Sequence, residues 1–422
     1  MPRSLLPDSA DTSPAGNLSV GGVDLLELCA EVGTPVFVYD SQQLRSQCRL
    51  AKEAWQDSIA YASKAFWCLA MARLVAEEGL SVDVSTAGEL HVALRAGVPP
   101  ERLVVHGNNK SDAEVARALE VGAGRIVVDS FHEIERLEDL ATRMSKRPAV
   151  WVRVTPGIEA HTHHFVRTGQ EDSKFGFSLA SGAATDAAER VRRPGGPLRL
   201  AGLHTHIGSQ IFDLDPYRAA IAVLAPLVRH LEVEELCIGG GLGVAYVTGE
   251  EAPPLADWAE AVRKAAIEAG LPAQLRISAE PGRALVARAG LTCYTVGTIK
   301  VLPGIRTYVS VDGGMSDNPR PVLYGSGYEA FLPREWQADR PLEVRVVGKH
   351  CESGDVVVAD ARLPADLALG DVLATPVTGA YGHSMASNYN KVPRPPVVFA
   401  EGGRYRVVVR RESLDDLLGL DA

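Results

Sequence analysis

Eight short apolar runs alternate with helical patterns between residues 59 and 279. The runs occupy residues 59–63, 81–84, 102–105, 125–128, 149–154, 199–205, 235–238 and 275–279. The helical patterns between them include residues 67–78, 89–96, 112–121, 134–144, 180–192, 217–231 and 255–269. This alternation predicts parallel strands, because each helix returns the chain to the edge of the sheet where the next strand starts. Eight strands without an edge-strand pattern favour a closed (β/α)8 barrel of the TIM type over an open sheet.

A change of pattern near residue 286 predicts a second domain. Short β-rich runs without long helices occupy residues 291–300, 307–311, 342–347, 355–358, 372–375, 397–399 and 405–409. A chain of 422 residues also exceeds what one hydrophobic core usually supports. We expect an α/β barrel over residues 41–285 and a C-terminal β-barrel or β-sandwich over residues 286–422. Residues 1–40 form an N-terminal segment, with loose order over the first twenty and a strand at 35–39 that joins the β-domain.

Charge and cysteine usage exclude several classes of protein. The net charge is −10 without a block of like charges, which argues against binding to nucleic acid or to an anionic membrane. The six cysteines form no C-x-x-C pair, so we expect neither a disulfide framework nor a zinc ribbon. No stretch approaches eighteen consecutive apolar residues, and the first residues lack the apolar core of a signal peptide. We therefore expect a cytoplasmic enzyme.

Lys64 comes directly after the first apolar run, where a buried strand would reach the carboxyl end of the barrel. Active sites of such barrels lie at that end. Burial disfavours the charged ammonium, and the neutral amine is the nucleophile that condenses with an aldehyde such as pyridoxal phosphate. A lysine that only reaches solvent from a strand end is the structural alternative. The interpretation as a Schiff-base lysine therefore depends on the residues at the ends of the other strands.

The turns after the last two predicted strands indicate a phosphate site. Three glycines occupy residues 239–241, and Glu280-Pro-Gly-Arg283 comes after the eighth run. Phosphate sites in these barrels are often built from the loops after strands seven and eight. A glycine turn presents N–H groups to an anion, and an arginine can add a charge-assisted bond. A simple tight turn would explain the glycines alone, but it would not explain the second motif.

His206 has three interpretations: a structural histidine, a metal ligand, or an imidazole stacked on a flat cofactor ring. His204 and His206 would share a face of a strand, yet no third metal ligand is evident nearby. Lys64 and the glycine turn favour stacking. Glu280 would suit a partner of the pyridine nitrogen, because a carboxylate keeps that nitrogen protonated and the ring an effective electron sink. A turn-capping surface carboxylate is the alternative for Glu280.

Three polar clusters interrupt the strand pattern of the β-domain, at residues 317–324, 350–355 and 379–383. Arg320 and Tyr324 are four residues apart, and they could bind a carboxylate or make simple loop contacts. Cys351 has polar neighbours at 352, 353 and 355, which makes it less typical of a buried core cysteine.

Together these motifs closely resemble the diaminopimelate decarboxylases, pyridoxal-phosphate enzymes of fold type III. The resemblance spans nearly the whole chain, through Tyr61-Ala-Ser-Lys64, Ser173-Lys-Phe-Gly176, His204-x-His-Ile-Gly-Ser209, Gly239-Gly-Gly241, Glu280-Pro-Gly-Arg283, Cys351-Glu-Ser-Gly-Asp355 and Ser387-Asn-Tyr-Asn390. Ornithine and arginine decarboxylases of this fold share the lysine, the glycines and the Glu-Pro-Gly-Arg motif. The substrate-side motifs look like the diaminopimelate branch, so the resemblance implies conversion of meso-2,6-diaminopimelate to L-lysine and CO2, the last step of lysine biosynthesis.

The resemblance also implies roles for individual residues. Lys64 would bind pyridoxal 5'-phosphate covalently, and Cys351 would assist reprotonation at the substrate Cα. The implied cofactor contacts are Lys64, His206, Ser209, Gly239, Gly240, Gly241, Glu280, Gly282, Arg283 and Tyr381. The implied substrate contacts are Arg283, Arg320, Tyr324, Glu352 and Tyr381. Asp83 and Glu89 would support the site, and no metal is implied. Cys351 and Glu352 would reach the active site of a neighbouring subunit, which implies a homodimer with shared sites.

Three other functions stay open on the sequence. The first is a related fold-type III amino-acid decarboxylase that acts on ornithine, arginine or another diamino diacid. A metal-dependent barrel hydrolase could use His161, His163, His164, His204 and His206 as ligands. That function would leave Lys64 and the glycine turn without a role. A non-catalytic, cofactor-binding paralogue is the third alternative, and the presence of both Lys64 and Cys351 disfavours it.

Overall fold

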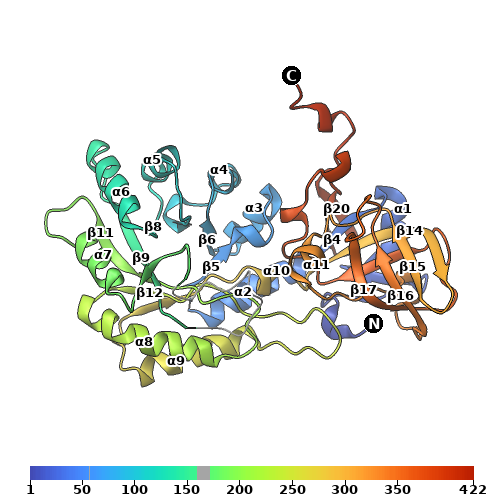
Figure 1. Ribbon diagram of the computed structural model, residues 1–422, viewed down its shortest axis with the longest axis horizontal. Helices are drawn as coiled ribbons and strands as arrows, with labels where there is room; N and C mark the ends of the chain where they lie inside the picture. The colour runs from blue at the N-terminus through green and yellow to red at the C-terminus, as the bar shows by residue number, and fades with distance from the viewer. Residues whose placement is uncertain (57, 159–171) are drawn as a thin grey trace. The chain divides into compact units, whose positions relative to one another are not determined.

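The computed structural model describes residues 1–56, 58–158 and 172–422. The chain forms two compact units (Figure 1). The barrel unit comprises Cys48–Gly243 and Ala252–Ala284. The β-unit comprises Met1–Gln47, Val244–Glu251 and Leu285–Ala422, so it takes in a short segment from within the range predicted for the barrel.

Eight parallel strands form the wall of the barrel unit, and the predicted barrel is confirmed. They are β5 (Ala60–Ala62), β6 (Ser81–Val84), β7 (Leu103–Val105), β8 (Arg125–Val128), β9 (Ala149–Thr155), β11 (Arg199–His204), β12 (Glu235–Cys237) and β13 (Arg276–Ser278). Each strand pairs with the next, and a parallel bridge between Ile59 and Ala279 joins the last strand to the first. The short strand β10 (Phe177–Ser178) adds to β9.

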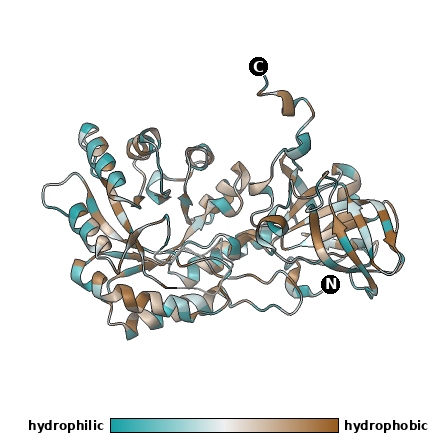
Figure 2. Ribbon diagram, viewed as in Figure 1, coloured by the Kyte–Doolittle hydropathy of each residue, from teal (hydrophilic) through white to brown (hydrophobic). Residues whose placement is uncertain are grey.

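Helices separate these strands along the chain, close to the predicted positions. They are α3 (Leu69–Glu77), α4 (Ala87–Ala96), α5 (Asp112–Val121), α6 (Phe131–Arg143), α7 (Ala183–Val191), α8 (Asp215–Leu231) and α9 (Leu255–Glu268). Two further helices flank the strands: α2 (Ser41–Ala54) precedes β5, and α10 (Arg283–Val286) follows β13. Thr86, Ser111 and Ser130 cap three of them by accepting backbone N–H groups of the first turn. Figure 2 shows polar and apolar residues along both α8 and α9, as expected for helices that bury one face. Among the described residues, no helix is long and apolar enough to cross a membrane.

The interior of the barrel is filled by side chains rather than by solvent. One buried cluster contains Ala60, Val104, Val127, Trp151, Ala201 and Cys237, which come from six different strands. A single large indole packs among smaller side chains, which is how a barrel of this size closes its centre. The functional groups must therefore lie at one of the two ends.

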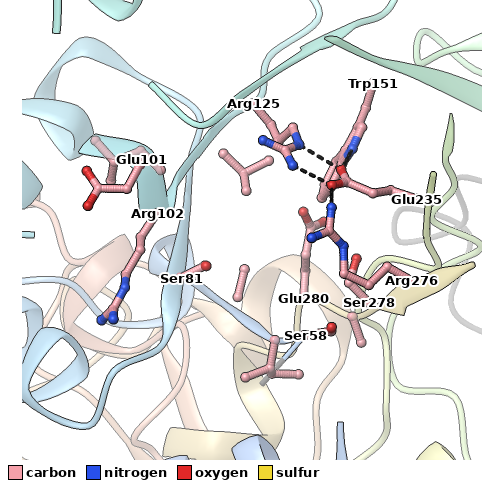
Figure 3. A pocket seen from close by; sticks show the side chains of 15 residues that line it. Ser58, Ser81, Glu101, Arg102, Arg125, Trp151, Glu235, Arg276, Ser278 and Glu280 are labelled. Carbon is pink, nitrogen blue, oxygen red and sulfur yellow. Dashed lines mark hydrogen bonds and ion pairs between the residues drawn. The ribbon is translucent and has the colours of Figure 1, made fainter. Parts of the chain in front are cut away.

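A hollow of about 180 Å³ opens at the amino-terminal end of the barrel strands (Figure 3). There the Glu235 carboxylate, 4% exposed, accepts a hydrogen bond from the Arg125 Nε at 2.7 Å and from the Trp151 indole at 2.5 Å. Arg276 forms an ion pair with the same carboxylate. Because this carboxylate already has three partners, we interpret the cluster as a structural clasp between β8, β9, β12 and β13.

Replacing Glu235 with alanine should destabilise the fold by about 3 kcal/mol, because it removes the buried carboxylate that accepts hydrogen bonds from the partly buried Arg125. The free energy of unfolding from a denaturant titration measures this effect. Glu234→Ala is the matched control: its side chain is 66% exposed, so the change should stay within about 0.5 kcal/mol. Equal losses in the two variants would contradict the role of the clasp.

The β-unit contains a mixed sheet with the order β17-β16-β15-β14-β4-β19-β20, and β18 pairs with β14. Its strands are β4 (Val36–Asp40), β14 (Gly290–Leu302), β15 (Arg306–Val311), β16 (Leu342–Val347), β17 (Val356–Leu363), β18 (Val372–Pro376), β19 (Val397–Glu401) and β20 (Arg404–Val409). Strand β4 lies between β14 and β19, which confirms that the strand predicted at 35–39 joins this domain.

The prediction of a loosely ordered N-terminus was wrong. Residues before β4 form β1 (Asp11–Thr12), β2 (Leu18–Val20), β3 (Val23–Asp24) and α1 (Leu25–Val32). Leu6 and Leu18 are fully buried in a core that also contains Phe331. Helix α1 was not predicted, although Asp24 caps it by accepting the N–H groups of Leu26 and Glu27. An aspartate with a glutamate three residues later was the available signal.

Candidate functional site

The carboxyl end of the barrel brings Lys64 next to the turn after β13. The Ala62 N–H donates to the Pro281 carbonyl at 3.2 Å. A Cβ atom at Gly282 would lie 2.9 Å from the Ala65 Cβ and 3.0 Å from the Ala62 oxygen. The Glu280–Arg283 turn therefore packs against the residues on both sides of Lys64, and a side chain at position 282 would separate them.

Lys64 lies in a single 3-10 turn, Ser63–Ala65, directly after β5. Its neighbours Ser63 and Ala65 are buried, whereas its own side chain is exposed. The predicted desolvation of this amine is therefore wrong for this structure. The side chain leaves the end of a buried strand toward solvent, where an aldehyde could reach it.

Close backbone approach explains the three glycines after β12. A Cβ at Gly240 would lie 2.4 Å from the backbone carbonyl oxygen of Glu280, and one at Gly241 would lie 2.4 Å from that of Gly208. Gly239 and Gly241 also have positive φ angles of 68° and 106°. The Gly240 N–H donates to the His206 Nδ1 at 3.1 Å and the Gly239 N–H to the Cys237 Sγ at 3.4 Å. In this structure the N–H groups of Gly239 and Gly240 therefore have partners within the protein.

Arg283 and Ser209 lie side by side at the same end of the barrel. The Arg283 Nη2 donates to the Ser209 Oγ at 3.1 Å, and Arg283 is 9% exposed. This contact joins the loop after β11 to the first residue of α10, so a cation and a hydroxyl group lie together beside the glycine turn.

Glu280 is the buried carboxylate of this site. Its Oε1 lies 2.9 Å from the His106 Nε2 and its Oε2 lies 2.9 Å from the His204 Nε2. Burial alone would raise the pKa of Glu280, but the charges and hydrogen bonds of the two histidines hold that pKa well below its usual value. Burial lowers the pKa of His204 to about 4. The sequence places His106 at the end of a predicted strand, but no sequence pattern indicated that His106 contacts Glu280.

Asp83 and Glu89 support this arrangement in different ways. Asp83 lies 3.8 Å from the His106 Nε2, and burial raises the pKa of Asp83 to about 6 despite the nearby charge of His106. Glu89 accepts hydrogen bonds from the backbone N–H and the hydroxyl of Ser85 at 2.7 and 2.9 Å. Asp83 therefore contacts the histidine, whereas Glu89 orders the loop after β6.

His206 and His204 do not form one metal-binding pair. Strand β11 ends at His204, which binds Glu280, whereas His206 accepts from Gly240. Burial and the charges of Lys64 and Arg153 hold the pKa of His206 well below its usual value, so this imidazole is neutral. His161, His163 and His164 of the hydrolase alternative lie outside the described residues. Within the described ranges, the metal-type ligands that gather are His106, His204 and Glu280.

The Ser173–Gly176 motif is anchored at the end of β9. The Gly176 N–H donates to Asp129 at 2.7 Å, and the Thr155 hydroxyl donates to the Phe175 carbonyl at 2.7 Å. The Arg153 guanidinium lies 4.3 Å from the centre of the Phe175 ring. No role was predicted for this motif from the sequence. In the structure it is a loop fixed at the carboxyl end of the barrel.

In the β-unit, Arg320 is enclosed by two tyrosines that the sequence did not single out. It starts helix α11 (Arg320–Tyr324) and is 3% exposed. Its guanidinium lies 4.2 Å from the centre of the Tyr246 ring, and its Nη1 donates to the Tyr328 hydroxyl at 2.5 Å. Aromatic faces attract a guanidinium and also fix its plane. Tyr324, at the other end of α11, is half-buried.

The remaining predicted residues of the β-unit lie on loops. Cys351 and Glu352 are exposed, and Glu352 accepts a hydrogen bond from the Tyr389 hydroxyl. Their loop is held by Asp355, which accepts the His350 N–H at 2.8 Å. Tyr381 is half-buried and has a φ angle of 59°, which is unusual for a residue with a side chain.

Comparisons with known proteins agree with the geometry. Residues 41–287 match the profile of the pyridoxal-dependent decarboxylase, pyridoxal binding domain. Diaminopimelate decarboxylase of Mycobacterium tuberculosis is 44% identical over an alignment 435 positions long, which covers 98% of this chain and 97% of that protein. The crystal structure of diaminopimelate decarboxylase from M. jannaschii has a TM-score of 0.92 and 31% identity, with 98% of each chain covered. That of the Helicobacter pylori enzyme complexed with L-lysine has a TM-score of 0.87 and 32% identity, covering 94% of this chain and 99% of that chain.

Proposed function

The chain belongs to the diaminopimelate decarboxylase family of pyridoxal-dependent enzymes, and we propose that it converts meso-2,6-diaminopimelate into L-lysine and CO2. The observation that carries this proposal is the buried Glu280, whose two oxygens each lie 2.9 Å from a histidine, on the turn that packs against Lys64. An amine that can form a Schiff base and a carboxylate that can pair with the pyridine nitrogen are two groups that sites for pyridoxal phosphate commonly provide. The reaction is the last step of lysine biosynthesis.

The residues at the carboxyl end of the barrel fit the cofactor. When bound, pyridoxal phosphate supplies an electron sink for the electron pair that departing CO2 leaves at the substrate Cα. Lys64 would hold its aldehyde covalently, and the substrate would present the amine of its D-configured centre at the same place. Glu280 would accept a hydrogen bond from the protonated pyridine nitrogen, and His206 would stack on the ring. The phosphate and the adjoining ring would contact Ser209, Gly239, Gly240, Gly241, Gly282, Arg283 and Tyr381.

A diacid substrate explains the arginines. Arg283 and Arg320 would bind the distal carboxylate, and each can offer two parallel N–H donors. Tyr324, Glu352 and Tyr381 would complete this pocket. Cys351 would deliver a proton to Cα after CO2 has left. These assignments rest on the motifs shared with the family. The guanidinium of Arg320, enclosed by Tyr246 and Tyr328, supports the assignment of Arg320 to the distal carboxylate of the substrate.

We also propose a homodimer in which Cys351 and Glu352 act in the site of the partner subunit. The exposure of both residues on the β-unit supports this proposal. A monomer in sedimentation equilibrium at the assay concentration would contradict it. A cytoplasmic location is proposed as well, because none of the six cysteines, all of which lie within the described ranges, forms a disulfide, as expected in a reducing compartment.

Decarboxylation assays test the proposed function directly. CO2 release is measured from meso-, LL- and DD-diaminopimelate, lysine, ornithine and arginine, with and without added pyridoxal phosphate. We expect release from the meso isomer, with L-lysine as the product, and little release from the mono-acids, which would leave the arginines unpaired. Comparable rates with ornithine would overturn the assignment of the substrate.

Gly240→Ala should weaken pyridoxal phosphate binding roughly tenfold, because overpacking of this kind typically costs 1–3 kcal/mol. The new methyl group would lie 2.4 Å from the Glu280 carbonyl and would push the two phosphate-site turns apart. Fluorescence titration of the apoprotein measures the dissociation constant. Gly297→Ala is the control, because its methyl group would meet its nearest atom, the Ser310 oxygen, at 3.9 Å. Unchanged binding in Gly240→Ala would show that the turn tolerates the shift.

A further inference from the structure

Glu280 is held by two histidines from different strands. His106 comes directly after β7 and His204 ends β11, and the Nε2 of each lies 2.9 Å from a different oxygen of the carboxylate. The three side chains are buried, and the two imidazole rings meet edge to face with centres 4.8 Å apart. The carboxylate cannot rotate about its Cγ–Cδ bond without losing both hydrogen bonds.

We propose that His106 and His204 are positioning residues for Glu280: His106 carries a proton and keeps the carboxylate ionised, whereas neutral His204 fixes its orientation. This inference rests on the proposed function, because it concerns how Glu280 meets the pyridine nitrogen. It assigns different tasks to two histidines that make hydrogen bonds of equal length to the same group.

The surroundings of the two imidazoles distinguish their protonation states. The His106 Nε2 lies 2.9 Å from Glu280 and 3.8 Å from Asp83, so two carboxylates favour its charged form. The His204 Nδ1 is buried and has no hydrogen-bond partner among the described residues. A protonated His204 would leave an N–H group there without an acceptor, whereas the neutral Nε2–H tautomer leaves only an unused lone pair.

The other groups that face this cluster agree with the assignment. Burial would lower the pKa of His106, but Asp83 and Glu280 raise it above its usual value, with a smaller opposing effect of Arg153. Burial, His106 and Arg153 lower the pKa of His204 against the effect of Glu280. The Lys64 amine lowers the pKa of Asp83, and the Glu89 carboxylate raises it. The charge of Glu280 raises the pKa of the Cys237 thiol. His106 therefore stays charged to a higher pH than a free histidine, and His204 loses its charge at a lower one.

The chemical consequence concerns the direction of one hydrogen bond. An ionised carboxylate has about four lone-pair positions, and the two histidines occupy two of them. The remaining positions can accept a proton-bearing pyridine nitrogen but cannot donate to it. If the charge of His106 is removed, burial raises the pKa of Glu280, and a protonated Glu280 would no longer require the nitrogen to carry a proton.

Binding of two cofactors that differ in one atom tests the proposal. Apoprotein variants His106→Gln and His204→Gln are titrated with pyridoxal phosphate and with its 1-deaza analogue, in which carbon replaces the pyridine nitrogen. We expect His106→Gln to weaken binding of pyridoxal phosphate roughly ten- to a hundredfold, the range for a lost hydrogen bond to a charged group. Binding of the analogue should stay unchanged, because it has no nitrogen to present to Glu280. His230→Gln, at a 58% exposed histidine of α8, is the matched control.

The result for His204→Gln separates charge from orientation. Glutamine keeps a neutral donor, so this variant should retain most of the preference for pyridoxal phosphate over the analogue. The absorption spectrum of the bound cofactor should change its pH dependence in His106→Gln and not in His204→Gln. An equal loss of preference in the two variants, or no loss in His106→Gln, would overturn the proposal.

A measurement on the unaltered protein keeps the proposal testable if a variant does not fold. In ¹⁵N-histidine spectra of the wild-type holoenzyme at pH 7, His106 should be doubly protonated and His204 should be the Nε2–H tautomer. A neutral His106 or a charged His204 would refute the assignment. If the wild-type chain binds no pyridoxal phosphate or releases no CO2 from diaminopimelate, the proposed function fails instead, which is a separate outcome.

Discussion

Lys64→Ala is expected to lower kcat for CO2 release by ~10⁴-fold, in the range seen when a covalent catalytic group is deleted. The lost ε-amine is the group that would hold the aldehyde of the cofactor beside the Glu280–Arg283 turn. The Lys64 side chain is exposed, so its removal should change the free energy of unfolding by no more than about 0.5 kcal/mol. Activity should therefore be lost from a folded protein, which circular dichroism verifies.

Chemical trapping identifies the lysine independently of rates. Borohydride reduction of the wild-type holoenzyme, with subsequent peptide mapping, should place the cofactor mass on Lys64. Lys64→Ala should take up no reducible cofactor. Lys264→Ala, at a 66% exposed lysine of α9, is the control and should retain full activity and labelling. Labelling of any lysine other than Lys64 would refute the role of this residue.

Arg320→Met is expected to lower kcat/KM for meso-diaminopimelate roughly 10²- to 10³-fold, the equivalent of about 3 to 4 kcal/mol for losing one partner of a buried charge pair. Methionine retains an unbranched apolar side chain between Tyr246 and Tyr328 but offers no N–H donors. The distal carboxylate of the substrate would then be desolvated without a partner. The loss should fall on the diacid, so the rate ratio of diaminopimelate to ornithine should fall as well.

The substrate panel with two arginine variants measures this ratio. Arg404→Met is the control, since Arg404 is exposed on β20 of the same unit. An unchanged preference for the diacid in Arg320→Met would show that Arg320 supports the fold of the β-unit rather than substrate selection. A similar loss in both variants would point to a general effect on the β-unit.

Local sequence patterns predicted most of the fold. The eight strands and the helices between them were found because burial of one face imposes a period on the residues that form it. The strand at 35–39 was assigned correctly to the β-domain, and the residues at the ends of the strands were identified. The N-terminal segment was missed, because its leucines are buried by residues as distant as Phe331, a contact that no local window contains.

The order of strands and helices, and the polar residues that each strand end presents, are therefore properties of the local sequence. Which of these groups meet depends on the folded chain. His106 and Glu280 are 174 residues apart, and Tyr246 reaches Arg320 from a segment within the barrel range. Periodicity reports burial along one element, whereas a hydrogen bond or a cation–aromatic contact requires the path of the whole chain. The exposure of Lys64 also depends on the folded chain, because neighbouring elements and not the strand itself set the solvation of its amine.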